Sequence, residues 1–194
     1  ATMHPRFVRP RLVEALADTP VVLVHGPRQC GKTTLARQVG DAAGYAYLTF
    51  DDEVLRASAK ADPLGFVDDL PEKAVLDEVQ RAPGLFLPLK ALVDRDRRPG
   101  RFLLTGSANV LALPRAAEHL VGRMALFTLW PLSQGELEGR KEGFLSALFA
   151  EEVPPVQGEG RWPLERLLRG GYPEAVRLPP ERRGAWFRDY LATV

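Results

Sequence analysis

One short segment restricts the fold of this 194-residue chain more than any other. Val21–His25 is an almost continuous apolar run, which is typical of a strand buried on both faces of a sheet. A helical pattern begins at about Lys32 and ends near Gly40. Between them lies the pattern glycine, four residues, Gly-Lys-Thr, made up of Gly26, Pro27, Arg28, Gln29, Cys30, Gly31, Lys32 and Thr33. A strand, this loop and a helix in that order predict a phosphate-binding loop.

The residue types of this loop have chemical reasons. Glycines let the backbone curl so that successive N–H groups face one anion, and the N-terminus of the helix adds its dipole. Lys32 supplies a positive charge for the β- and γ-phosphates of a nucleotide, and Thr33 offers a hydroxyl ligand to Mg²⁺. Thr34 is expected to contact phosphate as well. We therefore expect Gly26–Thr34 to bind the cofactors ATP and Mg²⁺.

A second motif follows the short apolar run Ala74–Leu76, where two adjacent carboxylates, Asp77 and Glu78, come at the end of a predicted strand. Asp77 is expected to hold Mg²⁺ through its water shell, and Glu78 to polarise an attacking water as the general base. Together with the upstream loop, this pair meets both requirements of a P-loop hydrolase.

Two further candidates lie later in the chain. The predicted strand Arg101–Thr105 is followed by small polar residues, and Ser107 is the candidate to contact the γ-phosphate or the attacking water, with Thr105 and Asn109 as alternatives. Arg123 leads into the last predicted strand. The sequence leaves two roles open for this arginine, a finger that reaches the nucleotide of a neighbouring subunit or a surface ion pair.

The order of elements predicts the fold class. Strand patterns alternate with helical patterns at Val21–His25, Tyr45–Phe50, Ala74–Leu76, Arg101–Thr105 and Met124–Leu129. This alternation predicts an α/β P-loop NTPase fold with a mostly parallel five-stranded sheet flanked by helices, and ligands beyond the carboxyl ends of the strands. Past Pro131 only helical patterns follow. We expect a P-loop ATPase core over residues 1–130 and a smaller helical region over residues 131–194 that leads into a C-terminal domain beyond this chain.

Composition excludes several classes of protein. The 26 Lys and Arg residues nearly balance the 25 Asp and Glu residues, which excludes a strongly basic nucleic-acid binder. The apolar runs fall far short of the roughly 18 residues that a membrane span needs. The one cysteine excludes an internal disulfide, and the three histidines match no zinc spacing. No apolar segment of a secretory signal follows the N-terminus, so we expect a cytoplasmic protein.

In this order, the motifs resemble the AAA+ branch of P-loop ATPases. More narrowly, they resemble the prokaryotic AAA-type ATPase family that carries an uncharacterised C-terminal domain, in the stretches Gly26–Thr34, Leu76–Gln80, Leu104–Ser107, Val121–Arg123, Trp130–Ser133 and Gly170–Pro173. The resemblance implies an ATPase core followed by a C-terminal half that is sometimes considered nuclease-like or DNA-associated, and it supports the finger role of Arg123. It leaves open a homo-oligomer and a DNA or protein partner. One departure is Cys30, where a small aliphatic residue is commoner.

Three functions fit these residues. The first is an AAA+-type ATPase that hydrolyses Mg·ATP to drive a conformational change in a partner or an attached domain. The second is a nucleotide-dependent switch or scaffold with little turnover. The third is a P-loop kinase, which the pairing of Glu78 with Asp77 and the lack of an arginine-rich lid shortly after the strand Arg101–Thr105 disfavour.

Overall fold

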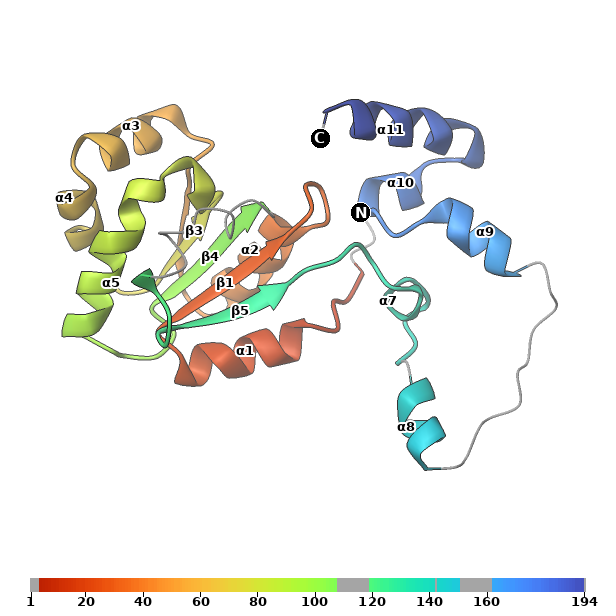
Figure 1. The fold of residues 1–194 in the computed structure, drawn as a ribbon, viewed down its shortest axis with the longest axis horizontal. Coiled ribbons are helices and arrows are strands. Elements are labelled where there is room, and N and C mark those ends of the chain that lie inside the picture. Colours follow the sequence, from red (N-terminus) through yellow and green to blue (C-terminus); the bar gives the residue numbers. More distant parts are fainter. Residues whose placement is uncertain (1–3, 108–118, 142, 151–161, 194) are drawn as a thin grey trace. The chain divides into compact units, whose positions relative to one another are not determined.

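The computed structural model describes residues 4–107, 119–141, 143–150 and 162–193 (Figure 1). The chain divides into two compact units. The core unit is Val8–Trp130, and the helical unit combines Ala1–Phe7 with Pro131–Val194. Among the described residues, no helix has both the length and the apolar character to cross a membrane.

The core unit is built on a five-stranded sheet in the order β2-β3-β4-β1-β5, and its neighbouring strands pair in parallel. Its strands are β1 (Val21–Gly26), β2 (Ala46–Thr49), β3 (Ala74–Asp77), β4 (Phe102–Ser107) and β5 (Met124–Thr128). Since all of them run in one direction, their carboxyl ends meet at one edge of the sheet. The predicted mostly parallel, five-stranded sheet is confirmed.

Helices cover both faces of this sheet (Figure 1). They are α1 (Arg9–Asp18), α2 (Lys32–Ala42), α3 (Glu53–Ala61), α4 (Pro63–Asp68) and α5 (Phe86–Arg95), with the 3₁₀ turns η1 (Val79–Arg81) and η2 (Pro83–Leu85). Successive side chains of a strand point to opposite faces. Val21 and Leu23 accordingly lie in one apolar cluster with residues of α3, α4 and α5, whereas Val22 and Val24 lie in a second cluster with residues of α1 and α2.

The helical unit contains only helices among its described elements, as the sequence predicts. They are α7 (Gln134–Glu138), α8 (Phe144–Phe149), α9 (Trp162–Arg169), α10 (Pro173–Arg177) and α11 (Pro180–Thr193). Glu136 organises the start of this unit, because its buried carboxylate accepts hydrogen bonds from the backbone N–H of Phe7 (2.7 Å) and from Arg6 Nε (3.2 Å). The same glutamate forms a capping box with Ser133.

Two of the sequence stretches that carry the family resemblance contact each other in the helical unit, through Leu132 and Gly171. The backbone N–H of Leu132 donates to the carbonyl oxygen of Gly171 over 2.7 Å. A Cβ atom at Gly171 would lie 2.2 Å from the carbonyl oxygen of Leu132. Glycine is therefore required at position 171, because two backbones approach each other closely there. This explains the second glycine of the stretch Gly170–Pro173.

A similar close approach at the end of β1 yields a first prediction. A Cβ atom at Gly26 would lie 2.1 Å from the carbonyl oxygen of Leu129, and backbone atoms cannot rotate away as a side chain can. Gly26→Ala is therefore expected to lower the free energy of unfolding by about 1–3 kcal/mol, measured by urea denaturation.

The matched control is Gly84→Ala, also in the core unit. There the nearest atom to an added Cβ is Pro63 Cγ at 3.7 Å, which is ordinary contact. This variant is expected to stay within about 0.5 kcal/mol of the wild type. Equal stabilities of the two variants would contradict the packing argument at Gly26.

Candidate active site

The loop between β1 and α2 is shaped to receive an anion. Gln29 (φ 60°) and Gly31 (φ 101°) adopt left-handed backbone conformations, which curl the chain before the helix begins. Gly31 occupies the N-cap of α2, and no side-chain hydrogen bond caps the helix there. The first backbone N–H groups of a helix need partners from outside the helix. An uncapped N-terminus behind a curled loop therefore fits a phosphate group.

Lys32 lies inside the curve of this loop. Its side chain is only 5% exposed, and its Nζ donates to the carbonyl oxygens of Gly26 (3.2 Å) and Pro27 (2.7 Å). The positive charge of Lys32 also acts on His25, whose pKa is lowered first by burial and then by this charge. The loop thus presents a positive potential at the carboxyl end of β1.

Asp77 is the point where several elements of the core unit meet. Its carboxylate is 2% exposed and accepts hydrogen bonds from Thr33 Oγ1 (3.1 Å to each oxygen), from the hydroxyl of Tyr47 (2.6 Å) and from Thr105 Oγ1. These partners come from α2, β2 and β4. The structure thus brings together Thr33 and Asp77, the two residues predicted to hold Mg²⁺, and their oxygen atoms fit the preference of that ion.

Tyr47 is a member of this group that the sequence did not single out. Burial raises the pKa of its hydroxyl, and the hydrogen bond to Asp77 raises it further. The guanidinium of Arg37 lies over its ring, with Cζ 3.8 Å from the ring centroid. Only the pairing of β2 with β3 brings Tyr47 to Asp77, and no local motif signals that pairing.

Glu78 follows Asp77 in an unusual backbone conformation. Its φ of 60° and ψ of 43° are left-handed, which costs of order 1–3 kcal/mol for a residue other than glycine. Its backbone N–H donates to Thr105 Oγ1 over 3.2 Å, and its Oε2 accepts a hydrogen bond from Gln80 Nε2. Such outliers persist where the surroundings hold them, which is common at functional sites.

The candidates at the end of β4 and just beyond it differ in what they contact. Thr105 is fully buried, and its hydroxyl joins the Asp77 carboxylate to the backbone of Glu78. Ser107 lies at the end of β4, where its backbone N–H donates to Gln80 Oε1 over 3.3 Å. Asn109 lies outside the described residues. Thr105 therefore contacts both acidic residues of the site, whereas the Ser107 side chain makes no hydrogen bond with the described part of the chain.

Cys30 belongs to the loop through its backbone. Its side chain is fully buried, packs in the apolar cluster beneath α2, and donates from Sγ to the carbonyl oxygen of Leu129 over 3.2 Å. Any contact of Cys30 with a phosphate would therefore come from its backbone N–H.

Arg123 lies at the amino ends of the strands, whereas the loop lies at their carboxyl ends. It immediately precedes β5, whose first residue is in register with Val21 at the start of β1. A strand of six residues spans roughly 15–20 Å at 3.3 Å per residue, so Arg123 does not reach the loop of its own chain. Its guanidinium pairs with Asp94 and donates to the carbonyl oxygen of Val121 (3.0 Å).

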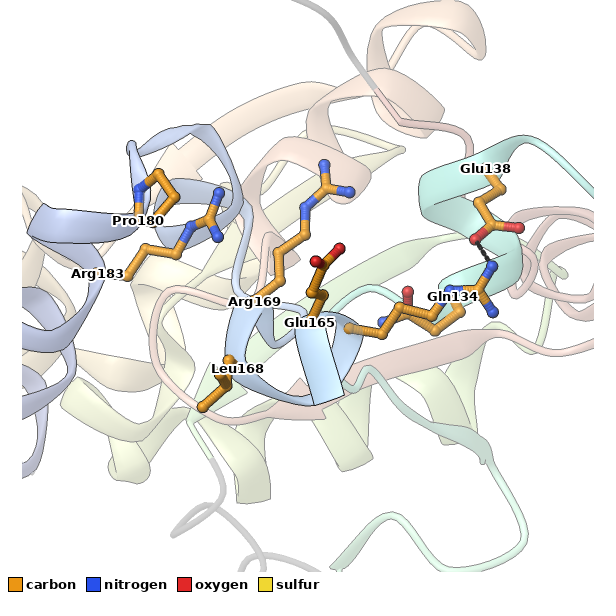
Figure 2. A pocket seen from close by; sticks show the side chains of 8 residues that line it. Gln134, Glu138, Glu165, Leu168, Arg169, Pro180 and Arg183 are labelled. Atoms are coloured by element: carbon orange, nitrogen blue, oxygen red, sulfur yellow. Dashed lines mark ion pairs between the residues drawn. The ribbon is translucent and has the colours of Figure 1, made fainter. Parts of the chain in front are cut away.

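A separate cavity of about 720 Å³ lies in the helical unit, between α7, α9 and the start of α11 (Figure 2). Arginines and glutamates make up most of its polar lining, and Arg166 forms an ion pair with Glu138. In Figure 2, Glu165 projects beside Arg169. The charges are thus nearly balanced, and the cavity includes none of the residues that the sequence predicts for the site.

The fold and the site together define a class of protein. A parallel sheet with a phosphate-type loop after β1 and an acidic pair after β3 is the architecture of P-loop NTPases. A profile of the AAA domain family matches residues 18–138. The chain therefore belongs to the AAA domain family of P-loop ATPases, and the predicted membership in this group is confirmed.

Curated relatives extend beyond the matched region. Uncharacterised proteins of Mycobacterium bovis and Mycobacterium tuberculosis are each 38% identical to this chain over 185 residues. The match covers 94% of this chain but only 37% of either relative. The chain thus spans little more than a third of the length of these proteins.

Solved structures share the fold. AMPPCP-bound DnaA from Aquifex aeolicus superposes with a TM-score of 0.52 at 16% identity, covering 94% of this chain and 64% of that one. A DNA replication initiation factor gives a TM-score of 0.50 at 14% identity, covering 77% and 51%. Identities this low establish the similarity of the fold alone.

The ion pair of Arg123 yields a prediction about acid stability. The guanidinium of Arg123, followed by Lys90, lowers the pKa of Asp94 from its ordinary value of 3.8 to about 2. Because the folded state binds this proton less readily, the pair stabilises the protein above about pH 4, and this stabilisation is lost as the pH falls toward 2. The difference in melting temperature between wild type and Asp94→Asn should be full at pH 6, shrink below about pH 4 and disappear as the pH falls through about 2.

Glu14→Gln serves as the control for this experiment. Glu14 is exposed on α1 and forms no ion pair within the described ranges. Its variant should follow the wild type at every pH. A gap for Asp94→Asn that stays constant down to pH 2 would contradict the assignment of the ion pair.

Proposed function

We propose that the protein binds Mg·ATP in the loop Gly26–Thr34 and hydrolyses it, and that hydrolysis drives a conformational change in a partner or in an attached domain. One observation carries this proposal. The loop with Lys32, the contact between Thr33 and Asp77, and the adjacent Glu78 converge at the carboxyl edge of one parallel sheet. The shared fold of AMPPCP-bound DnaA supports a nucleotide in this place.

Different groups of the site would bind the phosphates and the Mg²⁺ ion. Backbone N–H groups of the loop and the N-terminus of α2 would hold the phosphates, and Lys32 would exchange a loop carbonyl for phosphate oxygen. Thr33 and Asp77 would hold Mg²⁺, directly and through water respectively. When bound, this ion neutralises charge that develops on the phosphate oxygens. The two residues already share a hydrogen bond, so the ligand atoms need little rearrangement.

Glu78 would act on the attacking water. One of its oxygens accepts from Gln80, and the other makes no hydrogen bond with the described residues, which leaves it to accept the proton of a water. The water oxygen then bonds to the γ-phosphorus while the bond to the bridging oxygen of ADP breaks. The residues contribute position and charge, which supply most of the catalysis in this reaction class.

The wider assembly is also part of the proposal. We propose that residues 1–130 act as the ATPase core and residues 131–194 as the helical region that responds to it. The greater length of the relatives is consistent with an attached domain, through which DNA or a protein would bind, and a homo-oligomer would let Arg123 serve a neighbour. A switch with little turnover is the second candidate, and slow hydrolysis by the wild type despite an intact Glu78 would favour it.

The division of roles predicts different defects for two variants. Lys32→Ala should abolish tight ATP binding, because the buried ammonium is the charge inside the loop. Glu78→Gln should bind Mg·ATP with wild-type affinity and hydrolyse it about 10²–10⁴ times more slowly, the usual contribution of a general base. Isothermal titration measures the binding, and phosphate release measures the turnover.

The results also separate the candidate functions. Equal turnover of wild type and Glu78→Gln would sink the assignment as a hydrolase. Tight binding with negligible wild-type turnover would favour the switch, and a phosphorylated acceptor in place of free phosphate would favour a kinase.

Arg123 is predicted to serve the site of a neighbouring subunit. It lies at the sheet edge remote from its own loop, so a catalytic role requires a second chain. Fingers supplied in trans contribute about 10³–10⁵ in rate. Arg123→Ala should therefore retain ATP binding and lose turnover, and mixing it with Glu78→Gln subunits should recover activity that neither variant has alone.

The matched control is Arg95→Ala. Arg95 also lies near the amino edge of the sheet, at the end of α5, and forms an exposed ion pair with Asp68 (2.6 Å). Its removal should leave turnover unchanged. If a demonstrated mixed oligomer of Arg123→Ala and Glu78→Gln subunits recovers no ATP turnover, Arg123 has only a structural role, in its ion pair with Asp94.

A further inference from the structure

The side chain of Gln80 makes two hydrogen bonds, and the mechanism described so far assigns this residue no role of its own. Its Nε2 donates to Glu78 Oε2, and its Oε1 accepts from the backbone N–H of Ser107 over 3.3 Å. One planar amide thus spans from the acidic residue after β3 to the last residue of β4. The sequence singled out its neighbours Asp77 and Glu78 but assigned Gln80 no role.

The two hydrogen bonds fix the orientation of this amide. An amide has a donating NH₂ on one side and an accepting oxygen on the other. If the amide of Gln80 were flipped, its oxygen would face the carboxylate of Glu78 and its NH₂ would face the N–H of Ser107. Both contacts would then be lost, so the NH₂ group is directed at Glu78.

The backbone around Gln80 is also held firmly. The preceding residue, Val79, is 2% exposed and packs in the apolar cluster beneath α3, α4 and α5. On the other side of the contact, the backbone N–H of Glu78 is held by Thr105 Oγ1. The backbone on both sides of the contact is thus held in place, and the hydrogen bond from Gln80 holds one oxygen of the Glu78 carboxylate.

We propose that Gln80 is a positioning residue that holds one oxygen of Glu78 in place and ties the carboxylate to the end of β4. The inference rests on the proposed hydrolysis of ATP and deepens it. With Oε2 engaged, only the second oxygen of Glu78 remains to orient the attacking water. Because the same amide also accepts from Ser107, a displacement at the end of β4 is transmitted to the carboxylate, which gives this site a means of regulation.

The experiment compares three substitutions of Gln80 in the full chain. Gln80→Ala removes the side chain, Gln80→Met keeps its length without hydrogen bonds, and Gln80→Glu places a like charge beside Glu78. Each should bind Mg·ATP within about twofold of the wild type, because Gln80 does not belong to the loop. A carboxylate displaced by about 1 Å loses roughly 10²-fold in rate, so kcat should fall by about 10–100-fold, and furthest for Gln80→Glu.

A double mutant separates positioning from a general structural effect. If Gln80 acts through Glu78, Gln80→Met should lower single-turnover hydrolysis no further in the Glu78→Gln background, because residues that act as a unit are not additive. Arg81→Ala is the matched control on the same 3₁₀ turn. Its side chain pairs with Asp51 (3.0 Å) and not with Glu78, so its kcat should equal that of the wild type.

Several outcomes would overturn the inference. One is wild-type kcat for Gln80→Met, and another is an equal loss with and without the Glu78 side chain. A loss of ATP affinity in proportion to kcat would make Gln80 merely structural. Gln80→Met retains the packing volume and gives the answer if Gln80→Ala fails to fold. Wild-type turnover no greater than that of Lys32→Ala would instead refute the proposed function, and the inference would fall with it.

Discussion

A buried carboxylate that must remain paired organises the core unit. Asp77 is almost inaccessible to solvent, and an ion in such a place is tolerated only when hydrogen bonds replace its hydration. Those bonds come from hydroxyls of α2, β2 and β4. The carboxyl edge of the sheet can satisfy Asp77 only when three neighbouring elements are correctly placed. Asp77, which fits a metal site, therefore also depends on the correct placement of the elements around it.

Local pattern and tertiary pairing account for different parts of this site. The loop, Asp77 and Glu78 were predictable, because strand, glycine loop, helix and strand-end carboxylates are all contiguous in the chain. Tyr47 and Gln80 were not, because Tyr47 depends on the pairing of β2 with β3 and Gln80 on a side-chain contact with the end of β4. Likewise, the number and direction of the strands followed from alternation, but nothing local specified the order β2-β3-β4-β1-β5.

The type of a residue also predicts its chemistry better than it predicts where its side chain points. The sequence placed Cys30 in the loop, yet its buried thiol packs in the apolar cluster beneath α2 and donates to the carbonyl oxygen of Leu129. Arg123 was left between two roles. The structure contains the surface ion pair with Asp94. Because an exposed ion pair of this kind is weak, it does not conflict with the role in trans that we propose for Arg123.

The backbone of Glu78 links stability to chemistry at this site. Its left-handed conformation would suit glycine or asparagine better, and neither of these carries the carboxylate to which we assign the attacking water. The strain is offset locally, because Thr105 holds the backbone N–H and Gln80 holds the side chain. A strand that ended at Asp77 in an ordinary extended conformation would direct the next side chain to the opposite face of the sheet. The left-handed conformation departs from that alternation, and the Glu78 side chain instead lies against Gln80, whose amide also contacts the end of β4.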